Sequence, residues 1–227
     1  SQQMLKPVRL LSEDRTALRW ELERHQPILE ASFFQRLLSG GFASSRELEE
    51  YMQYVGLKIR SALYCIALIQ IEPSAGARGQ SAQQIKQERL IVADAMSRVK
   101  GNREAFVHSV GKSSVMVMVA GTEARLGNAL SADLESMAGD AIRLVPQSIA
   151  ERCACGIGTP YASLLDVSRS AEEAQLMIEH LLLSHGRGCA RYSSISRQQN
   201  EYSYSTAVES RVINLARSGQ GDELEAL

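Results

Sequence analysis

The tripeptide Gly111-Lys112-Ser113 resembles the end of a phosphate-binding loop. Such a loop requires a further glycine five residues earlier, and Phe106 occupies that position. The complete motif is therefore absent. Gly-Lys-Ser-Ser is also typical of a tight turn between two strands. This predicts that Lys112, Ser113 and Ser114 form a hairpin tip. The sequence leaves open whether this tip contacts a phosphate.

A second glycine motif, Gly156-Ile157-Gly158, follows a predicted strand, as the glycines of a dinucleotide-binding fingerprint do. Pro160 and Tyr161 stand where the rest of that fingerprint and the start of a helix are required. We interpret the segment as the exit of a strand into a tight loop.

Histidines and cysteines complete the set of residues that could do chemistry. The four histidines lack the spacing of two zinc ligands on one helix turn, the four cysteines form no C-x-x-C pair, and no G-x-S-x-G motif is present. We predict no catalytic residue, no cofactor and no metal site, and we expect the cysteines to be reduced thiols. The residues concerned are His25, His108, His180, His185, Cys65, Cys153, Cys155 and Cys189.

The composition narrows the class of protein. The 227 residues include 25 Lys+Arg and 26 Asp+Glu, so the net charge of -1 excludes a strongly basic nucleic-acid binder. Arg187, Arg191 and Arg197 are too sparse for a nucleic-acid patch. A hydrophobic fraction of 44% excludes a disordered chain. The longest apolar stretch, 62–71, is about half of the roughly 20 residues that span a membrane, so we expect a cytoplasmic protein without direct membrane contact.

The elements that must position these residues begin with helices. Apolar residues follow a heptad seam from Val8 to Leu29, and a second apolar helical face runs from Ile28 to Gly40. Ser44 and Glu47 form a capping box for a further helix that ends at Gly56. The same pattern at Ser81 and at Ser163 predicts the start of two later helices. Residues 1–58 are therefore predicted to be N-terminal signalling or dimerisation helices.

From residue 60 the period changes, and strands and helices alternate. The predicted order is β-α-β-β-α-β-α-β, an α+β, ferredoxin-like sheet with helices packed on it. We predict this domain over 59–197 and a connector helix within 198–227. The expected strands are 63–71, 105–110, 115–119, 150–157 and 190–192, and the expected helices are 82–100, 122–137 and 164–185.

Three segments of the chain, through their order and spacing, resemble a known protein family. Gly156-Ile157-Gly158 followed by residues 163–174 is similar to the signature that closes the degenerate GGDEF-like domain of AraC-type bacterial transcription regulators. Residues 29–57 resemble the helical opening of that domain, and residues 202–219 resemble the connector that precedes the DNA-binding region. The resemblance covers nearly the whole chain and implies a nucleotide-cyclase-like fold.

Active members of the wider GGDEF superfamily condense two GTP molecules into cyclic di-GMP, with Mg²⁺ held by carboxylates. In the alignment that the resemblance gives, the metal-binding aspartate falls on Gln70, with Glu72 nearby, and the signature hairpin reads Val110 to Ser114. An amide does not replace an anionic magnesium ligand, and Lys112 reverses the local charge. We therefore expect a degenerate domain without cyclase activity.

The resemblance implies a non-catalytic regulatory region that relays a signal and dimerises within an AraC-type regulator. We expect a homodimer paired through 8–29, a sensor region before Ser1 that is sometimes membrane-anchored, and DNA contact only through a domain after Leu227. Two alternatives stay open: a nucleotide-binding sensor module without turnover, and a residual nucleotide cyclase.

Overall fold

A computed structural model describes residues 26–73, 81–121, 128–184 and 186–194. The chain divides into two compact units, 1–192 and 193–227, and nearly all of the described residues belong to the first. The predicted seam between Val8 and Leu22 and the predicted connector lie outside the described residues.

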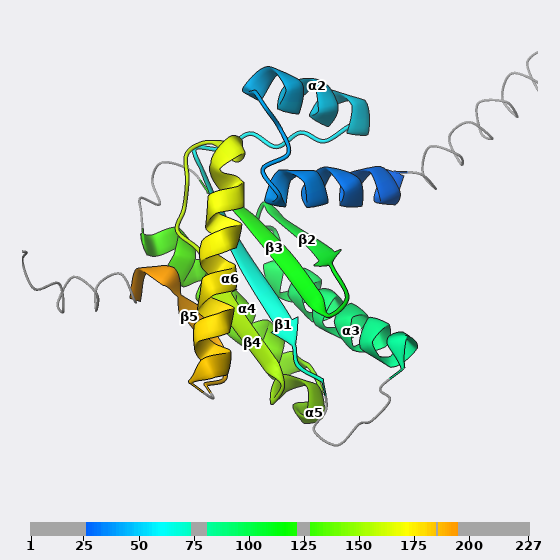
Figure 1. Cartoon of the computed structure of the whole chain (residues 1–227), viewed down its shortest axis with the longest axis vertical. Coiled ribbons are helices and arrows are strands. Elements are labelled where there is room, and N and C mark those ends of the chain that lie inside the picture. Colours follow the sequence, from blue (N-terminus) through cyan, green and yellow to red (C-terminus); the bar gives the residue numbers. More distant parts are fainter. Residues whose placement is uncertain (1–25, 74–80, 122–127, 185, 195–227) are drawn as a thin grey trace, which may run out of the picture. The chain divides into compact units, whose positions relative to one another are not determined.

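Five strands form one sheet in the order β2-β3-β1-β4-β5 (Figure 1). The central strand β1 is antiparallel to β3 on one side and to β4 on the other, β2 is antiparallel to β3, and β5 runs parallel to β4. The first four strands have the ferredoxin-like order, with β5 added at one edge. This confirms the predicted α+β class. The bounds are β1 Leu63–Ile71, β2 Ala105–Val110, β3 Ser114–Gly121, β4 Cys153–Ile157 and β5 Gly188–Arg191.

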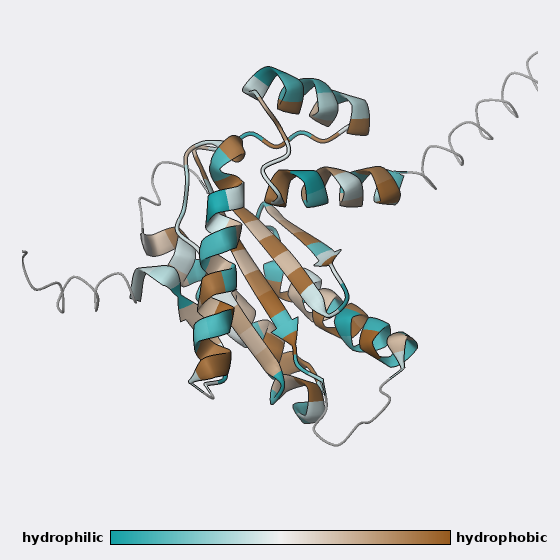
Figure 2. Cartoon of the chain, in the orientation of Figure 1, coloured by the Kyte–Doolittle hydropathy of each residue, from teal (hydrophilic) through white to brown (hydrophobic). Residues whose placement is uncertain are grey.

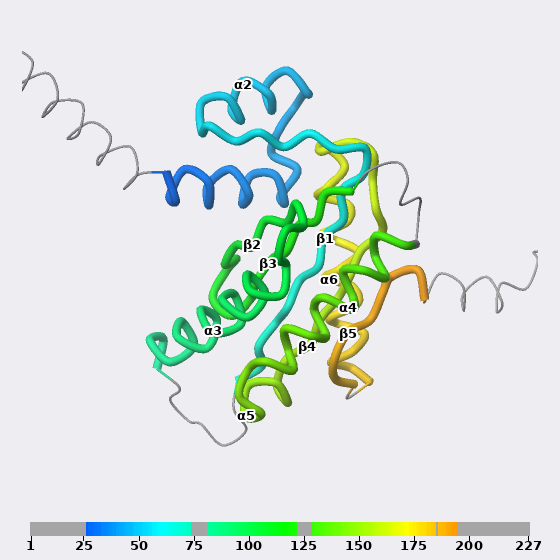
Figure 3. The backbone as a smooth tube through the Cα atoms, turned by 180° about the vertical axis from the view of Figure 1, so that it is seen from behind, coloured from blue at the N-terminus to red at the C-terminus, as the bar shows by residue number. Residues whose placement is uncertain are grey.

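Helices cover both faces of the sheet, so the central strands are buried on both sides. Helices α3 (Ala82–Lys100) and α4 (Asn128–Leu144) lie on one face, while α6 (Val167–Leu183) lies on the other (Figures 1 and 3). Alternate residues of β1 divide between two hydrophobic clusters, with Ile69 toward α3 and α4 and Ile66 toward α6. This is the reason that β1 reads as a continuous apolar run rather than an alternating one.

A pair of N-terminal helices completes the layer on the α6 face. Residues 26–38 are helical, and α2 (Ser45–Val55) follows after a short loop. Phe33 and Phe34 are buried in the cluster that also holds Ile66 of β1. Figure 2 shows hydrophobic residues on the sheet and on the helix faces that cover it.

The predicted caps at Ser44 and Ser81 are confirmed, whereas Ser163 caps the 3₁₀ turn Leu164–Asp166 that precedes α6 rather than α6 itself. The Ser44 side chain accepts a hydrogen bond from the backbone N–H of Glu47, and the Ser81 side chain accepts one from Gln84. The Glu47 carboxylate departs from the ideal capping box, because it accepts the backbone N–H of Ala43 at 2.9 Å. Its pKa is lowered by that bond and by the guanidinium of Arg36.

The structure corrects the predicted bounds of one helix and one strand. The helix expected to end at Met137 continues to Leu144, since Ala138 and Ala141 are buried against the sheet. The strand expected from Ala150 begins at Cys153, because residues 147–150 form a short helix, α5, started by hydrogen bonds to the Pro146 carbonyl.

Two apolar residues that the periodicity placed inside are exposed: Ile28 by 66% and Leu90 by 53%. Helix α3 instead turns Glu88, Val92 and Met96 inward, which puts Leu90 on its outer side. No helix among the described residues is long and apolar enough to span a membrane.

Candidate functional site

The hairpin between β2 and β3 lies beside the end of β1. Gln70 is the register partner of Ser114 on β3 and of Ala154 on β4, and the backbone N–H of Ile71 donates to the Ser113 carbonyl at 3.0 Å. The structure therefore brings Gln70 and the predicted hairpin tip together at one edge of the sheet.

Arg89 of α3 holds the hairpin tip through its backbone carbonyls. Its guanidinium donates to the carbonyl of Gly111 and, at 3.4 Å, to that of Lys112. Gly111 has a φ of 60°, in the left-handed region that a glycine adopts without strain. The Arg89 Nε atom is buried without a hydrogen-bond partner, and Lys112 is exposed. The tip thus exposes the Lys112 side chain, and Arg89 of α3 places a second cationic group against its backbone.

Arginines engage both carboxylates on the neighbouring elements. Glu72, directly after β1, pairs with Arg187 at 2.8 Å. Glu88 of α3 is 8% exposed and pairs with Arg152 at 2.7 Å. Arg152 also donates to the backbone carbonyl of Glu72 at 2.6 Å, so the two ion pairs form one connected group.

This set of side chains does not fit Mg²⁺. Glu72 is the only Asp or Glu in residues 63–87, and residues 105–121 contain none. Mg²⁺ is usually held by one or two carboxylates together with substrate phosphates, and the Glu72 carboxylate is already neutralised by Arg187. The described part of the chain contains no group of three or more His, Cys, Asp or Glu side chains arranged to hold a metal ion.

The second glycine motif brings α6 close to the sheet. A Cβ atom at Gly158 would lie 2.0 Å from the Ser170 carbonyl oxygen, and the Ser170 hydroxyl accepts the backbone N–H of Ile66 at 3.0 Å. Glu173 of α6 accepts hydrogen bonds from the backbone N–H of Thr159 at 2.7 Å and from the hydroxyl of Tyr161 at 2.8 Å. The segment is the predicted strand exit into a tight loop, and its glycines serve helix packing.

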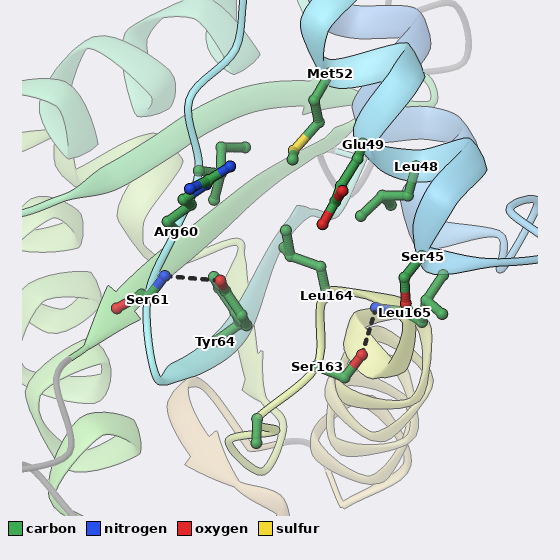
Figure 4. A pocket seen from close by; sticks show the side chains of 12 residues that line it. Ser45, Leu48, Glu49, Met52, Arg60, Ser61, Tyr64, Ser163, Leu164 and Leu165 are labelled. Carbon is green, nitrogen blue, oxygen red and sulfur yellow. Dashed lines mark hydrogen bonds between the residues drawn. The ribbon is translucent and has the colours of Figure 1, made fainter.

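A cavity of about 360 Å³ opens at the other end of β1, between α2, residues 59–61 and the 3₁₀ turn Leu164–Asp166 (Figure 4). Its buried wall is apolar, while Glu49 of α2 and Arg60 face the space from opposite sides. A second cavity of about 470 Å³ shares Glu49, Met52, Ile59 and Arg60 with the first. We call the two cavities together the α2 groove.

The polar groups of the α2 groove differ in what they contact. Ser61 is engaged, since its N–H donates to the Tyr64 hydroxyl at 2.8 Å and its hydroxyl donates to the Gly121 carbonyl at 2.6 Å. Glu49 and Arg60 make no hydrogen bond or ion pair with the described part of the chain. No sequence motif marks this groove, because residues far apart in the chain meet there only through packing of α2 on the domain.

The histidines and cysteines occupy separate places. The His108 ring on β2 stacks on Phe34 with ring centroids 4.2 Å apart, and His180 is exposed on α6. His25 and His185 lie outside the described residues. Burial raises the pKa of Cys65 to about 12 and that of Cys153 to about 11, as expected for small thiols packed in a core. Cys155 is buried, and Cys189 is partly buried.

The comparisons with known proteins identify the family. Residues 39–180 match the family model of the GGDEF-like domain, and the chain belongs to this family. A similar solved structure is the crystal structure of the GGDEF domain of DgcB from Caulobacter crescentus in complex with c-di-GMP. It is 13% identical, with a TM-score of 0.39, and the match covers 58% of this chain and 78% of that chain. No curated protein matches the chain. The predicted GGDEF-like membership is thus confirmed.

Proposed function

We propose that this chain is a cytoplasmic, non-catalytic GGDEF-like domain that relays a signal and dimerises within an AraC-type transcription regulator. The observation that carries the proposal is the charge at the edge where β1 ends. Gln70 and two serines stand beside Lys112 and Arg89 there, and Glu72 is paired with Arg187.

Phosphoryl transfer between two GTP molecules places several negative charges at one point, and metal ions neutralise them as the transition state forms. An edge where β1 and the hairpin contribute only the carboxylate of Glu72, already paired with Arg187, has little to hold those ions. Its arginine and lysine side chains can attract a phosphate, but they neither coordinate a metal nor activate a hydroxyl nucleophile. The edge is therefore suited to structure or binding rather than to condensation.

The packing of the N-terminal helices supports a relay. Phe34, on helix 26–38, is 1% exposed and contacts two rings of β2: Phe106, with centroids 5.6 Å apart, and His108. Strand β2 leads directly into the hairpin tip held by Arg89. A shift of helix 26–38 would thus reach the far end of the sheet through packed side chains.

The AraC context is supported by the sequence resemblance of residues 163–174 and 202–219. In this proposal the homodimer pairs through 8–29, a sensor region precedes the chain, and a further domain contacts DNA. Apart from residues 26–29, which belong to helix 26–38, these segments lie outside the described residues or outside the given sequence.

The test of the non-catalytic assignment is direct. The purified chain is incubated with GTP and Mg²⁺, and separately with Mn²⁺, and the nucleotides are resolved on an ion-exchange column beside an active GGDEF cyclase. We expect unchanged GTP while the active enzyme forms cyclic di-GMP. A cyclic di-GMP peak that grows with protein concentration would overturn the assignment.

A second candidate function, a sensor module that binds a small ligand without turnover, is favoured by the α2 groove. Arg60 offers a guanidinium that no other described residue engages for a phosphate, and the buried apolar wall offers a surface for a base. Thermal unfolding with GTP, GDP, ATP, cyclic di-GMP and cyclic di-AMP tests it, because a ligand that binds only the folded state raises Tm.

Two variants make that test specific. Arg60→Ala should abolish a ligand-induced rise in Tm, whereas Lys86→Ala, which removes an exposed charge on α3, should leave it intact. The absence of a shift with every nucleotide, or a shift that Arg60→Ala leaves unchanged, would contradict nucleotide binding in the groove.

A further inference from the structure

Two cysteines face each other on the last two strands of the sheet. Cys155 on β4 and Cys189 on β5 are direct register partners in a parallel pair. Neighbouring strands lie about 4.8 Å apart, and paired residues of parallel strands project to the same face. This separation falls within the range of about 4.4–6.8 Å between the Cα atoms of cysteines that form a disulfide. The fold thus places two thiols where a bond between them needs little backbone movement.

The two thiols differ in access. Cys155 is 0% exposed, whereas Cys189 is partly buried on a four-residue edge strand. Cys189 is therefore the more accessible of the two thiols to a small oxidant from solvent. An edge strand also adjusts more readily than a central one, because it is hydrogen-bonded on one side.

The electrostatic surroundings also favour Cys189 over Cys155 as the thiol that reacts first. Interaction between the two thiols lowers the pKa of Cys189 and raises that of Cys155. Burial and Glu135 of α4 raise the pKa of Cys189, and Arg143 of α4 lowers it. Glu135 is itself paired with Arg191 at 2.8 Å. Cys189 is thus the thiol that ionises first, and the thiolate is the nucleophilic form.

We propose that Cys189 is a peroxide-reactive cysteine and that Cys155 resolves its oxidised form to an intrachain disulfide. The Cys189 sulfur attacks the O–O bond of a hydroperoxide, takes one oxygen and becomes a sulfenic acid, while the other oxygen leaves with a proton as water or an alcohol. The Cys155 sulfur then attacks the Cys189 sulfur, the S–O bond breaks, and the hydroxyl leaves with the Cys155 proton as water. In total, two thiols are oxidised, and the hydroperoxide is reduced to an alcohol or water with release of one further water.

The disulfide would join β5 covalently to β4, closing a loop that contains α6. Strand β5 is followed in the sequence by the predicted connector. If the relay proposed above operates, oxidation would fix the point at which the chain leaves β5 toward the connector. The thiol chemistry itself does not depend on the relay.

The other cysteines provide matched controls. Cys65 on β1 donates its S–H to the Gly158 carbonyl at 3.3 Å, and Cys153 lies two residues before Cys155 without a cysteine opposite it on β5. Both are buried, and burial raises the pKa of each. Neither is expected to react on the time scale of Cys189.

The experiment follows the thiols of the whole chain. The reduced protein is treated with a few equivalents of hydrogen peroxide, quenched with N-ethylmaleimide under denaturing conditions, and its intact mass is measured. We expect two alkylated cysteines instead of four, a loss of two hydrogen atoms, a peptide pair that links Cys155 with Cys189, and full reversal by dithiothreitol. Four alkylated cysteines after peroxide treatment, or a link through Cys65 or Cys153, would overturn the proposal.

Variants assign the two roles. Cys155→Ser should leave a sulfenic acid on Cys189 that dimedone traps, and Cys189→Ser should abolish both the dimedone adduct and the disulfide. Cys65→Ser and Cys153→Ser should still form the disulfide. Where a buried serine prevents folding, Cys155→Ala takes its place, with circular dichroism as the check. A disulfide between two chains on non-reducing electrophoresis, in place of the intrachain bond, would contradict the assignment of Cys155.

Discussion

The carbonyl oxygen of Ala174 occupies the space that a side chain at Gly156 would need: a Cβ atom there would lie 1.9 Å from it. Gly158, directly after the end of β4, has the same relationship to the Ser170 carbonyl oxygen at 2.0 Å. Successive turns of α6 therefore rest directly on the backbone of β4. The glycines and the small residues of the 163–174 segment form one packing device, and this explains why they occur together as a signature.

Gly156→Ala should destabilise the fold by roughly 3 kcal/mol, the upper end of the usual overpacking cost, because α6 must move away from β4. Gly139→Ala is the control: it lies within α4, where an added Cβ meets nothing within 4 Å, and it should stabilise by about 0.5–1 kcal/mol. Urea unfolding followed by circular dichroism measures both. Equal stabilities of the two variants would show that α6 does not pack as closely as described.

Phe34→Ala should loosen helix 26–38 from β2 and cost about 3–5 kcal/mol, because a fully buried aromatic side chain is lost. Hydrogen exchange should increase along residues 105–121 as well as in the helix, since β2 loses its cover. Tyr54→Ala, at a residue 72% exposed, should change neither property. Exchange confined to the helix in Phe34→Ala would argue against a mechanical link to the hairpin.

The unfolding free energy should depend on pH through His108. Burial lowers the pKa of this imidazole below 6.5, Glu30 acts in the opposite direction, and Lys100 lowers it further. The unfolded chain therefore binds the proton at higher pH than the folded chain does. The contribution of neutral His108 to the free energy of unfolding is fully present above pH 6.5 and decreases as the pH falls through 6.5. It levels off below the folded-state pKa.

Urea unfolding between pH 7.5 and 5 measures this dependence. His108→Gln should flatten the decrease, whereas His180→Gln, on the exposed face of α6, should keep it. An unchanged slope in His108→Gln would assign the pH dependence to other groups.

The predicted seam is tested by self-association. Leu18→Glu together with Leu22→Glu places two carboxylates at seam positions and should convert a dimer to a monomer in sedimentation velocity. Thr16→Glu together with Ala17→Glu adds the same charge outside the seam and should leave the dimer intact. A dimer that survives the first pair of substitutions would exclude the seam as its interface.

Local signals in the sequence predicted most of the described elements. The bounds of β1 and β2 agree with the prediction, because each is an apolar run ended by turn residues, and the caps at Ser44 and Ser81 act as expected. The extent of α4 was wrong. The helix continues past Met137 and through Gly139, because burial of Ala138 and Ala141 against the sheet outweighs the cost of one glycine.

Some features of the candidate site could likewise be predicted from the sequence, and others could not. The sequence alone determined that the hairpin carries no acid, since this follows from residue identity and order, and the family resemblance predicts that Gln70 stands where a metal-binding aspartate is expected. Only the tertiary structure decided that Glu72 pairs with Arg187, that Glu49 and Arg60 face one groove, and that Cys155 meets Cys189. The physical reason is that hydrogen-bonded turns and alternating burial are set by neighbours along the chain. Ion pairs, grooves and thiol pairs depend instead on which distant segments the packed sheet brings together.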